Sequence, residues 1–94
     1  MPGIVRQGDY TSGHDGYPPT LPSDFSPDVF VNGCPVVIEN VDIITHCNPD
    51  DCHSGTYVGS HEVYANGRRI LVQGDNITCG DTCNECSSDV FIGG

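Results

Sequence analysis

Three residues of the types that coordinate zinc stand at related places in this sequence of 94 residues. His14, His46 and Cys79 each follow an aspartate by four or five residues. Imidazole nitrogen and thiolate sulfur are both ligands of Zn²⁺, and a closed tetrahedral site needs a fourth. His53 follows His46 by seven residues, in a loop long enough to fold back. We therefore predict a metal site made by these four residues, with His61 as the competing candidate for the fourth position.

Four protein ligands leave no coordination position for water, so the predicted metal would be structural rather than catalytic. It would fix the loops at one end of the fold and contribute folding free energy on the order of 10 kcal/mol in favourable cases. Taken singly, a loop histidine or a small buried cysteine needs no metal. The coincidence of three related positions favours one, and the mixed imidazole and thiolate set favours zinc over iron or copper.

These positions are related because a segment of eight residues occurs three times. Each copy has an acidic residue followed by Val, an aromatic residue and a third apolar residue, and each ends in Asn-Gly or Gly-Gly. The copies are residues 26–33, 60–67 and 87–94. This pattern predicts a short strand that runs into a tight turn.

A second element follows the first two copies and also stands at the N-terminus. Its three copies are residues 4–14, 36–46 and 70–79. Asp9, Asp42 and Asp75 within them are spaced by 33 and 33 residues. We therefore expect the C-terminal strand to pair with the N-terminal one, which completes a third hairpin and closes a three-sided object around a pseudo-threefold axis.

Composition favours an all-β fold for this repeat. Twelve Gly and seven Pro interrupt any long helix, and with only 36% apolar residues the chain buries a thin core. We expect one domain over residues 1–94, with an irregular loop at residues 15–25 that contains three prolines.

Charge and hydropathy exclude several classes of function. Three Arg and no Lys stand against 13 acidic residues, which gives a net charge of −10 and argues against binding to nucleic acid or anionic lipid. No apolar run approaches the roughly 18 residues of a membrane helix, and the first residues lack the apolar stretch of a secretory signal. No motif pairs a nucleophile with a base, so no enzymatic activity is expected.

The other cysteines leave several interpretations open. Cys83 and Cys86 form a C-x-x-C that could be a redox pair, half a zinc site or two free thiols. Cys47 and Cys52 flank a four-residue loop that a disulfide could close. If Cys79 holds metal, five cysteines remain, and this odd number favours mostly reduced thiols.

The repeat resembles the PAAR-repeat family, whose small conical proteins cap the spikes of type VI secretion systems and contractile phage tails. Residues 2–9 are similar to the opening of that family, residues 9–16 to its Asp-x-Thr-x-His-Gly segment, residues 63–75 to its central Asn-Gly repeat and residues 90–93 to its usual ending. The resemblance implies a metal held near the tip by three His and one Cys, which match His14, His46, His53 and Cys79. Gly13 departs from the pattern as an extra residue, and residues 15–25 are longer than the usual connection.

The resemblance implies a small conical pseudo-threefold β-hairpin repeat with a zinc site near its apex. Its broad base would dock on a trimeric β-helical spike of the valine-glycine repeat or phage tail-spike type, by edge pairing and through apolar residues such as Val31, Val63 and Ile92. A pseudo-threefold chain can cap a threefold partner. The protein would act mechanically, by piercing a target membrane that it touches only transiently. The protein would assemble in the cytoplasm and be delivered outside the cell, with or without an effector alongside.

A rival interpretation is a free-standing small zinc-binding or redox module that uses Cys79, Cys83 and Cys86. The two interpretations differ in their ligands, since replacing Cys83 and Cys86 would remove the metal only from the rival module.

Overall fold

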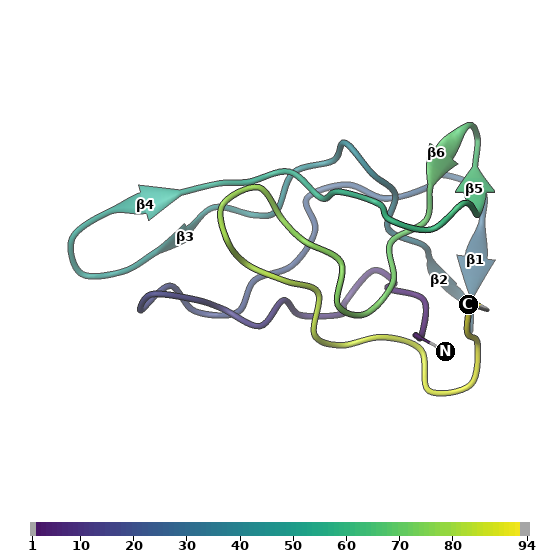
Figure 1. Ribbon diagram of the computed structural model, residues 1–94, viewed down its shortest axis with the longest axis horizontal. Coiled ribbons are helices and arrows are strands. Elements are labelled where there is room, and N and C mark those ends of the chain that lie inside the picture. The colour runs from purple at the N-terminus through teal and green to yellow at the C-terminus, as the bar shows by residue number, and fades with distance from the viewer. Residues whose placement is uncertain (1, 93–94) are drawn as a thin grey trace.

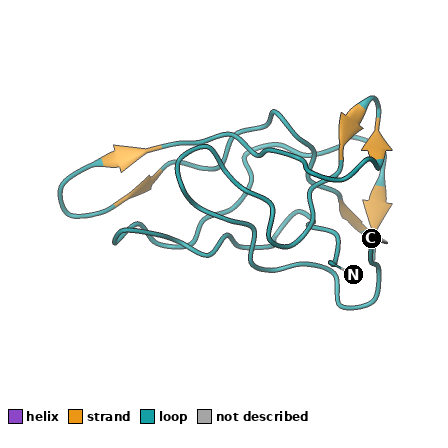
Figure 2. Cartoon of the chain, in the orientation of Figure 1, coloured by secondary structure: helices purple, strands orange, loops and turns teal. Residues whose placement is uncertain are grey.

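Short antiparallel hairpins are the regular elements of this protein, which we describe over residues 2–92 from a computed structural model. The six strands are β1 (Phe30–Val31), β2 (Cys34–Pro35), β3 (His46–Cys47), β4 (Cys52–His53), β5 (Tyr64–Ala65) and β6 (Arg68–Arg69). Each strand pairs with its neighbour in sequence. Figures 1 and 2 show that most of the chain between them is extended loop. Residues 2–92 contain no helix that could span a membrane.

Two of the hairpins are built on Asn-Gly turns. Asn32 and Gly33 have φ of 53° and 78°, and Asn66 and Gly67 have φ of 55° and 79°. Two consecutive residues with positive φ make the type I′ turn that joins strands with the natural twist of a hairpin. The turns join β1 to β2 and β5 to β6, at the two places where the repeated segment predicts them.

The two ends of the described chain form the third hairpin, as the repeat predicts. Gly3 pairs with Phe91 as an antiparallel bridge, and Ile4 N–H donates to the carbonyl of Val90 at 3.1 Å. The same bond joins residues 36 and 29 at 3.0 Å and residues 70 and 63 at 2.8 Å. The pseudo-threefold axis therefore relates all three hairpins, and the N-terminal segment belongs to the same repeat as residues 87–92.

A closed ring of backbone hydrogen bonds lies inside the hairpins. Val5 N–H donates to Leu71, Leu71 N–H to Val37, and Val37 N–H to Val5, at 2.9, 2.9 and 3.0 Å. All three side chains are buried. The core around them consists mostly of aliphatic residues from all three copies and also includes Tyr57 and Cys83; its other members are Ile4, Val36, Ile38, Val41, Ile43, Ala65, Ile70, Val72, Ile77 and Ile92.

The ring of backbone hydrogen bonds corrects the predicted spacing between the copies of the repeat. It makes Val5, Val37 and Leu71 equivalent, so the spacing between copies is 32 and 34 residues and not 33 and 33. The backbone agrees, because Gly8, Asn40 and Gly74 share a positive φ of 91°, 66° and 91°. The residue after each is Asp9, Val41 and Asp75, and Asp42 is displaced by one position. Aspartate was a misleading marker in the second copy, where a buried valine takes its place.

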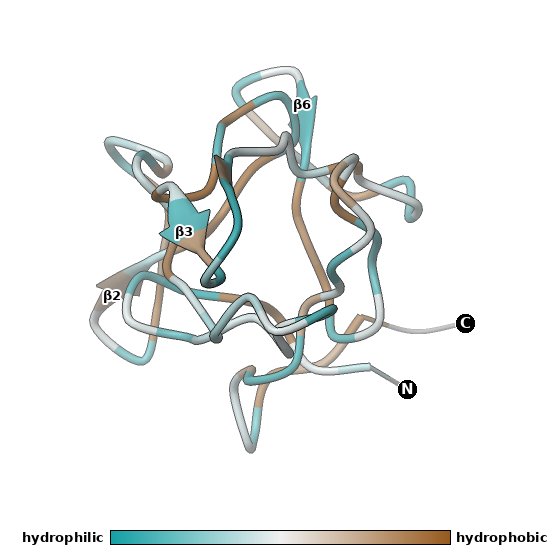
Figure 3. Cartoon of the chain, turned by 90° about the vertical axis from the view of Figure 1, so that its left-hand side faces the viewer, coloured by the Kyte–Doolittle hydropathy of each residue, from teal (hydrophilic) through white to brown (hydrophobic). Residues whose placement is uncertain are grey.

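The repeat gives the molecule a tapered, three-sided shape with extents of 38 × 23 × 22 Å. Figure 1 shows β1, β2, β5, β6 and both ends of the described chain at the wide end, while the β3–β4 hairpin extends to the narrow end. Seen from the narrow end in Figure 3, the chain surrounds a central axis in three lobes. We call these ends the base and the apex. Within residues 15–25, the structure has a tight pairing of Tyr17 with His14 and a bridge between Pro22 and Ile43.

Candidate metal centre

The four residues predicted as metal ligands lie together at the apex. One donor atom from each of His14, His46, His53 and Cys79 lies within 4.8 Å of the other three. The Nε2 atom of His53 is 2.7 Å from Nε2 of His46 and 3.0 Å from Nε2 of His14. The competing histidine, His61, lies outside this group and contacts the Ser60 hydroxyl.

The β3–β4 hairpin supplies two of the four side chains. His46 is directly opposite His53 in the antiparallel register, so both side chains leave the same face of the hairpin. His46 is buried, and its Nδ1 lies 2.8 Å from the carbonyl oxygen of Pro18. Because a carbonyl can only accept, Nδ1 carries the proton, and the lone pair of Nε2 points toward the other ligands.

The other two side chains come from separate segments. His14 precedes a two-residue turn in which Asp15 and Gly16 have φ of 47° and 80°. Cys79 precedes Gly80, whose φ is 104°. A Cβ on Gly55 would stand 2.9 Å from the Cβ of Cys79, so only a glycine lets the chain after His53 approach this closely. In the third copy of the repeat, the position equivalent to His14 and His46 is Gly80. Cys79 therefore stands one residue before the equivalent position.

The surroundings of His53 favour its neutral imidazole form. Burial lowers the pKa of His53 most, the neighbouring His46 and His14 lower it further, and Asp51 and Asp81 act in the opposite direction. Neutral imidazole is the form that binds a metal ion.

The donor set fits a tetrahedral metal ion. If Nε2 of His53 carries a proton, it can donate to only one of the two nearby Nε2 lone pairs and leaves the other without a partner. A cation at the centre would accept the lone pairs of all three imidazoles and of the Cys79 thiolate. Three nitrogens and one sulfur form a closed set that suits Zn²⁺.

Tyr17 is a member of the site that the sequence analysis missed. Its ring stacks on the ring of His53 with centroids 3.8 Å apart, and lies 4.9 and 5.1 Å from the rings of His46 and His14. Burial raises the pKa of its phenol, and Asp51 raises it further through its charge and a long hydrogen bond of 3.5 Å. The Asp-Gly pair at residues 15–16 was a signal available in the sequence, since it predicts a tight hairpin that places residue 17 opposite His14.

The remaining cysteines do not gather into a second site. Cys47 and Cys52 form a disulfide, which is one of the alternatives that the sequence left open. Burial raises the pKa of Cys83 to about 12, which makes its thiolate, the nucleophilic and metal-binding form, scarce. The Sγ of Cys86 lies instead close to Gly3, near the base. Within residues 2–92, the cluster of three His and Cys79 is the only group of this kind, so the ligand set of the rival module does not assemble.

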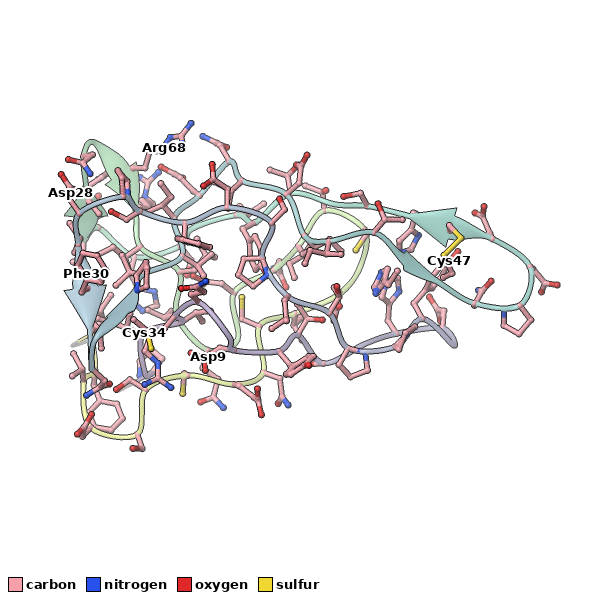
Figure 4. The ribbon with its side chains drawn as sticks, turned by 180° about the vertical axis from the view of Figure 1, so that it is seen from behind. Asp9, Asp28, Phe30, Cys34, Cys47 and Arg68 are labelled. Atoms are coloured by element: carbon pink, nitrogen blue, oxygen red, sulfur yellow. A yellow bond between two sulfur atoms is a disulfide. The ribbon has the colours of Figure 1, made fainter. Side chains whose placement is uncertain are left out.

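The base presents a different set of side chains from those expected to meet a partner. Ile92 is 6% exposed and belongs to the core, so its side chain is not available for docking, and Val31 is half-buried against the core. Val63 is exposed. The large exposed side chains at equivalent positions of the three hairpins are Phe30, Tyr64 and Phe91, which are 55%, 51% and 46% exposed. Figure 4 shows Phe30 at the wide end, with Cys47 at the opposite end.

The shortness of these strands explains why the sequence indicated Val31 and Ile92 rather than the exposed aromatic residues beside them. Successive side chains of a strand point to opposite faces, so an expectation that is wrong by one residue selects the buried face. In these hairpins the aromatic residue faces outward and the residue after it faces the core.

The chain matches a model of a known protein family. A family model described as "PAAR motif" matches residues 3–84, which include all four residues of the cluster. No curated protein matches the chain.

Proposed function

The chain belongs to the PAAR-motif family, and we propose that it is the zinc-stabilised tip that caps a trimeric β-helical spike. Proteins of this family serve as spike tips in contractile injection machines and associate with their spike proteins. The main support for a zinc-stabilised tip is a convergence of four side chains at the apex of the tapered, pseudo-threefold molecule: His14, His46, His53 and Cys79. That geometry puts the cross-linked end in front and leaves the wide end free for a partner.

The metal would stiffen an end of the molecule that has no apolar core of its own. His14, the β3–β4 hairpin and Cys79 reach the apex from three different parts of the chain. Bonds from one ion to all of them would oppose their separation under load. A closed set of four ligands provides no position for a substrate, so the metal's role in this proposal is structural and no turnover is involved.

The base would contact the spike through its three exposed aromatic residues. Phe30, Tyr64 and Phe91 stand on hairpins that the pseudo-threefold axis relates, so a single chain offers three similar contacts to a threefold partner. Large aromatic side chains dominate many interfaces because they bury much area at little entropic cost. These residues replace Ile92 and Val31 as the proposed contacts, and Val63 is retained.

Metal content of the purified protein tests the proposal. Elemental analysis should find about one zinc per chain in the wild type. His14→Ala and Cys79→Ser should each lose the metal and unfold at a lower temperature. His61→Ala is the matched control, because it removes a histidine outside the cluster and should keep the metal. Zinc absent from the wild type, or retained by both ligand variants, would overturn the proposed metal centre.

Docking has a separate test. The wild type should co-purify with a trimeric spike protein of the valine-glycine repeat or phage tail-spike type. Phe30→Asp and Tyr64→Asp should weaken that association strongly, since they put a charge into the apolar contact. Val58→Asp, at an exposed residue between β4 and β5, should leave it unchanged. Equal binding by all three variants would exclude the base as the docking surface.

A further inference from the structure

The disulfide at the apex lies one residue pair away from the metal cluster. In the β3–β4 hairpin His46 is opposite His53, and the next pair outward is Cys47 opposite Cys52. The disulfide therefore joins the two strands directly beyond the two imidazoles that they carry. Figure 4 shows the sulfur–sulfur bond at Cys47, near the narrow end. No other pair of cysteines in the described chain is bonded.

Little else holds the hairpin closed at its tip. The turn is closed by Asn48, whose N–H donates to the carbonyl of Asp51 at 2.8 Å and whose Oδ1 accepts from the N–H groups of Asp50 and Asp51. The tip contributes no apolar side chain to the core. Asp50 and Asp51 are adjacent and exposed, and their like charges repel. A two-stranded hairpin without a packed face is marginal in water.

Besides the long, exposed hydrogen bond of 3.5 Å from the Tyr17 hydroxyl to Asp51, one further contact ties the tip to the rest of the apex. Asn48 donates through Nδ2 to the carbonyl of Asp15 at 3.2 Å, across to the turn that follows His14. It is an exposed hydrogen bond and therefore contributes little to stability. Beyond the His46–His53 pair, the disulfide is thus the one covalent link between the two strands, and the other contacts there are hydrogen bonds of the turn and of the exposed surface.

We propose that the Cys47–Cys52 disulfide is a redox-reversible clasp that controls how tightly the apex holds its metal. The proposal rests on the proposed function, because it concerns the regulation of the same metal centre. With the bond formed, two of the four ligands, His46 and His53, are held opposite each other on the two strands. With the bond open, the ion must order the hairpin at the expense of its binding free energy, so its affinity falls. Conversely, a bound ion keeps the two thiols close and favours their oxidation, since coupling between two events is reciprocal.

Both cysteines of the disulfide lie at the surface, where a redox partner can approach. Cys47 and Cys52 are exposed, whereas Cys79 is partly buried within the cluster. Reduction by thiols transfers two electrons and two protons to the pair: one thiol attacks a sulfur, a second resolves the mixed disulfide, and the reductant leaves as its own disulfide. Thiols keep such bonds open in the cytoplasm, and in an oxidising compartment a disulfide of another molecule accepts the two electrons and two protons by the same exchange in reverse and closes the bond. The tip would therefore assemble with an open clasp and tighten its hold on the metal after delivery.

Zinc affinity in the two redox states tests this proposal. The protein is titrated with zinc against a competing chelator, once oxidised and once after reduction by a water-soluble phosphine. The phosphine gives two electrons to the disulfide, takes an oxygen from water to become a phosphine oxide, and leaves two thiols. A thiol assay on unfolded samples should count four thiols before reduction and six after it. Reduction should weaken zinc binding roughly tenfold or more, which is the typical cost of losing an outer support of a metal ligand.

Two variants separate the clasp from other effects of the reductant. Cys47→Ser/Cys52→Ser should bind zinc with the weaker affinity under both conditions. Cys34→Ser/Cys86→Ser removes two free thiols outside the cluster and should respond to reduction as the wild type does. Equal affinity in both states of the wild type, or tighter binding after reduction, would overturn the clasp and leave the metal centre intact. If the oxidised wild type binds no zinc at all, the proposed function itself fails.

Discussion

The base and the apex of this molecule are held together by different kinds of interaction. At the base, the backbone ring of Val5, Val37 and Leu71 lies inside a continuous aliphatic core. At the apex, four ligand side chains, a stacked tyrosine and a disulfide take the place of a core. The taper explains the difference, because a narrow cross-section has too much surface for its volume to bury apolar side chains. Burial stabilises the wide end, and cross-links stabilise the narrow one.

This comparison predicts that damage to the base unfolds the whole molecule. Leu71 is one of the three residues of the backbone ring, and its side chain is fully buried. Leu71→Ala should therefore lower the free energy of unfolding by about 2–5 kcal/mol. Denaturant unfolding measures the loss, which should be similar with zinc bound and after zinc is removed by a chelator. Val58→Ala, at an exposed site, is the control and should change little. A loss that disappeared on removal of zinc would show that the two ends are not independent.

Loss of the Tyr17 ring at the apex should weaken zinc binding without destabilising the base. Tyr17→Ala removes the ring that stacks on His53 at 3.8 Å, and should weaken zinc binding by about 1 kcal/mol, or roughly fivefold. Tyr17→Phe keeps the ring and loses only a long, exposed hydrogen bond to Asp51, so it should behave nearly as the wild type does. Chelator competition measures both. If the two variants lost affinity equally, the hydroxyl rather than the stacking would be the important contact.

The smallest predicted effect is a pH dependence at the rim of the base. Hydrogen bonds from Asn32 and from the Ser87 hydroxyl lower the pKa of the exposed Asp89 below its ordinary 3.8, although some desolvation opposes them. A carboxylate with a depressed pKa in the folded state stabilises the fold fully above the unfolded value and loses that contribution as the pH falls through the folded one. Stability should therefore fall slightly below pH 3.8.

A matched pair of variants isolates that carboxylate. Asp89→Asn should flatten the acid branch of a plot of stability against pH, while Glu62→Gln, at the corresponding position of the second copy, should leave it as in the wild type. An acid branch that Asp89→Asn does not change would assign the effect to another group. Zinc affinity measured at neutral pH should not respond to either variant, because both sites lie at the base.

Much of the base could be predicted from the sequence because its signals are local. Asn32-Gly33 and Asn66-Gly67 adopt the positive φ angles that their residue types favour. The repeat also predicted the pairing of residues 87–92 with the N-terminal segment, since a third hairpin had no other strand available. The choice among neighbouring residues failed, as at Ile92 and Asp42, because a strand of two residues gives too short an alternation to show which face is buried.

At the apex, the sequence by itself supplied the residue types and left their arrangement to the tertiary structure. His14, His46, His53 and Cys79 stand out by their chemistry and their place in the repeat, so the cluster could be predicted as a group. That Cys47 bonds to Cys52, that Cys83 is buried and that Tyr17 stacks on His53 depends on which segments meet when the repeat closes. Local sequence determines turns through backbone sterics, whereas contacts between distant segments depend on how the whole chain packs.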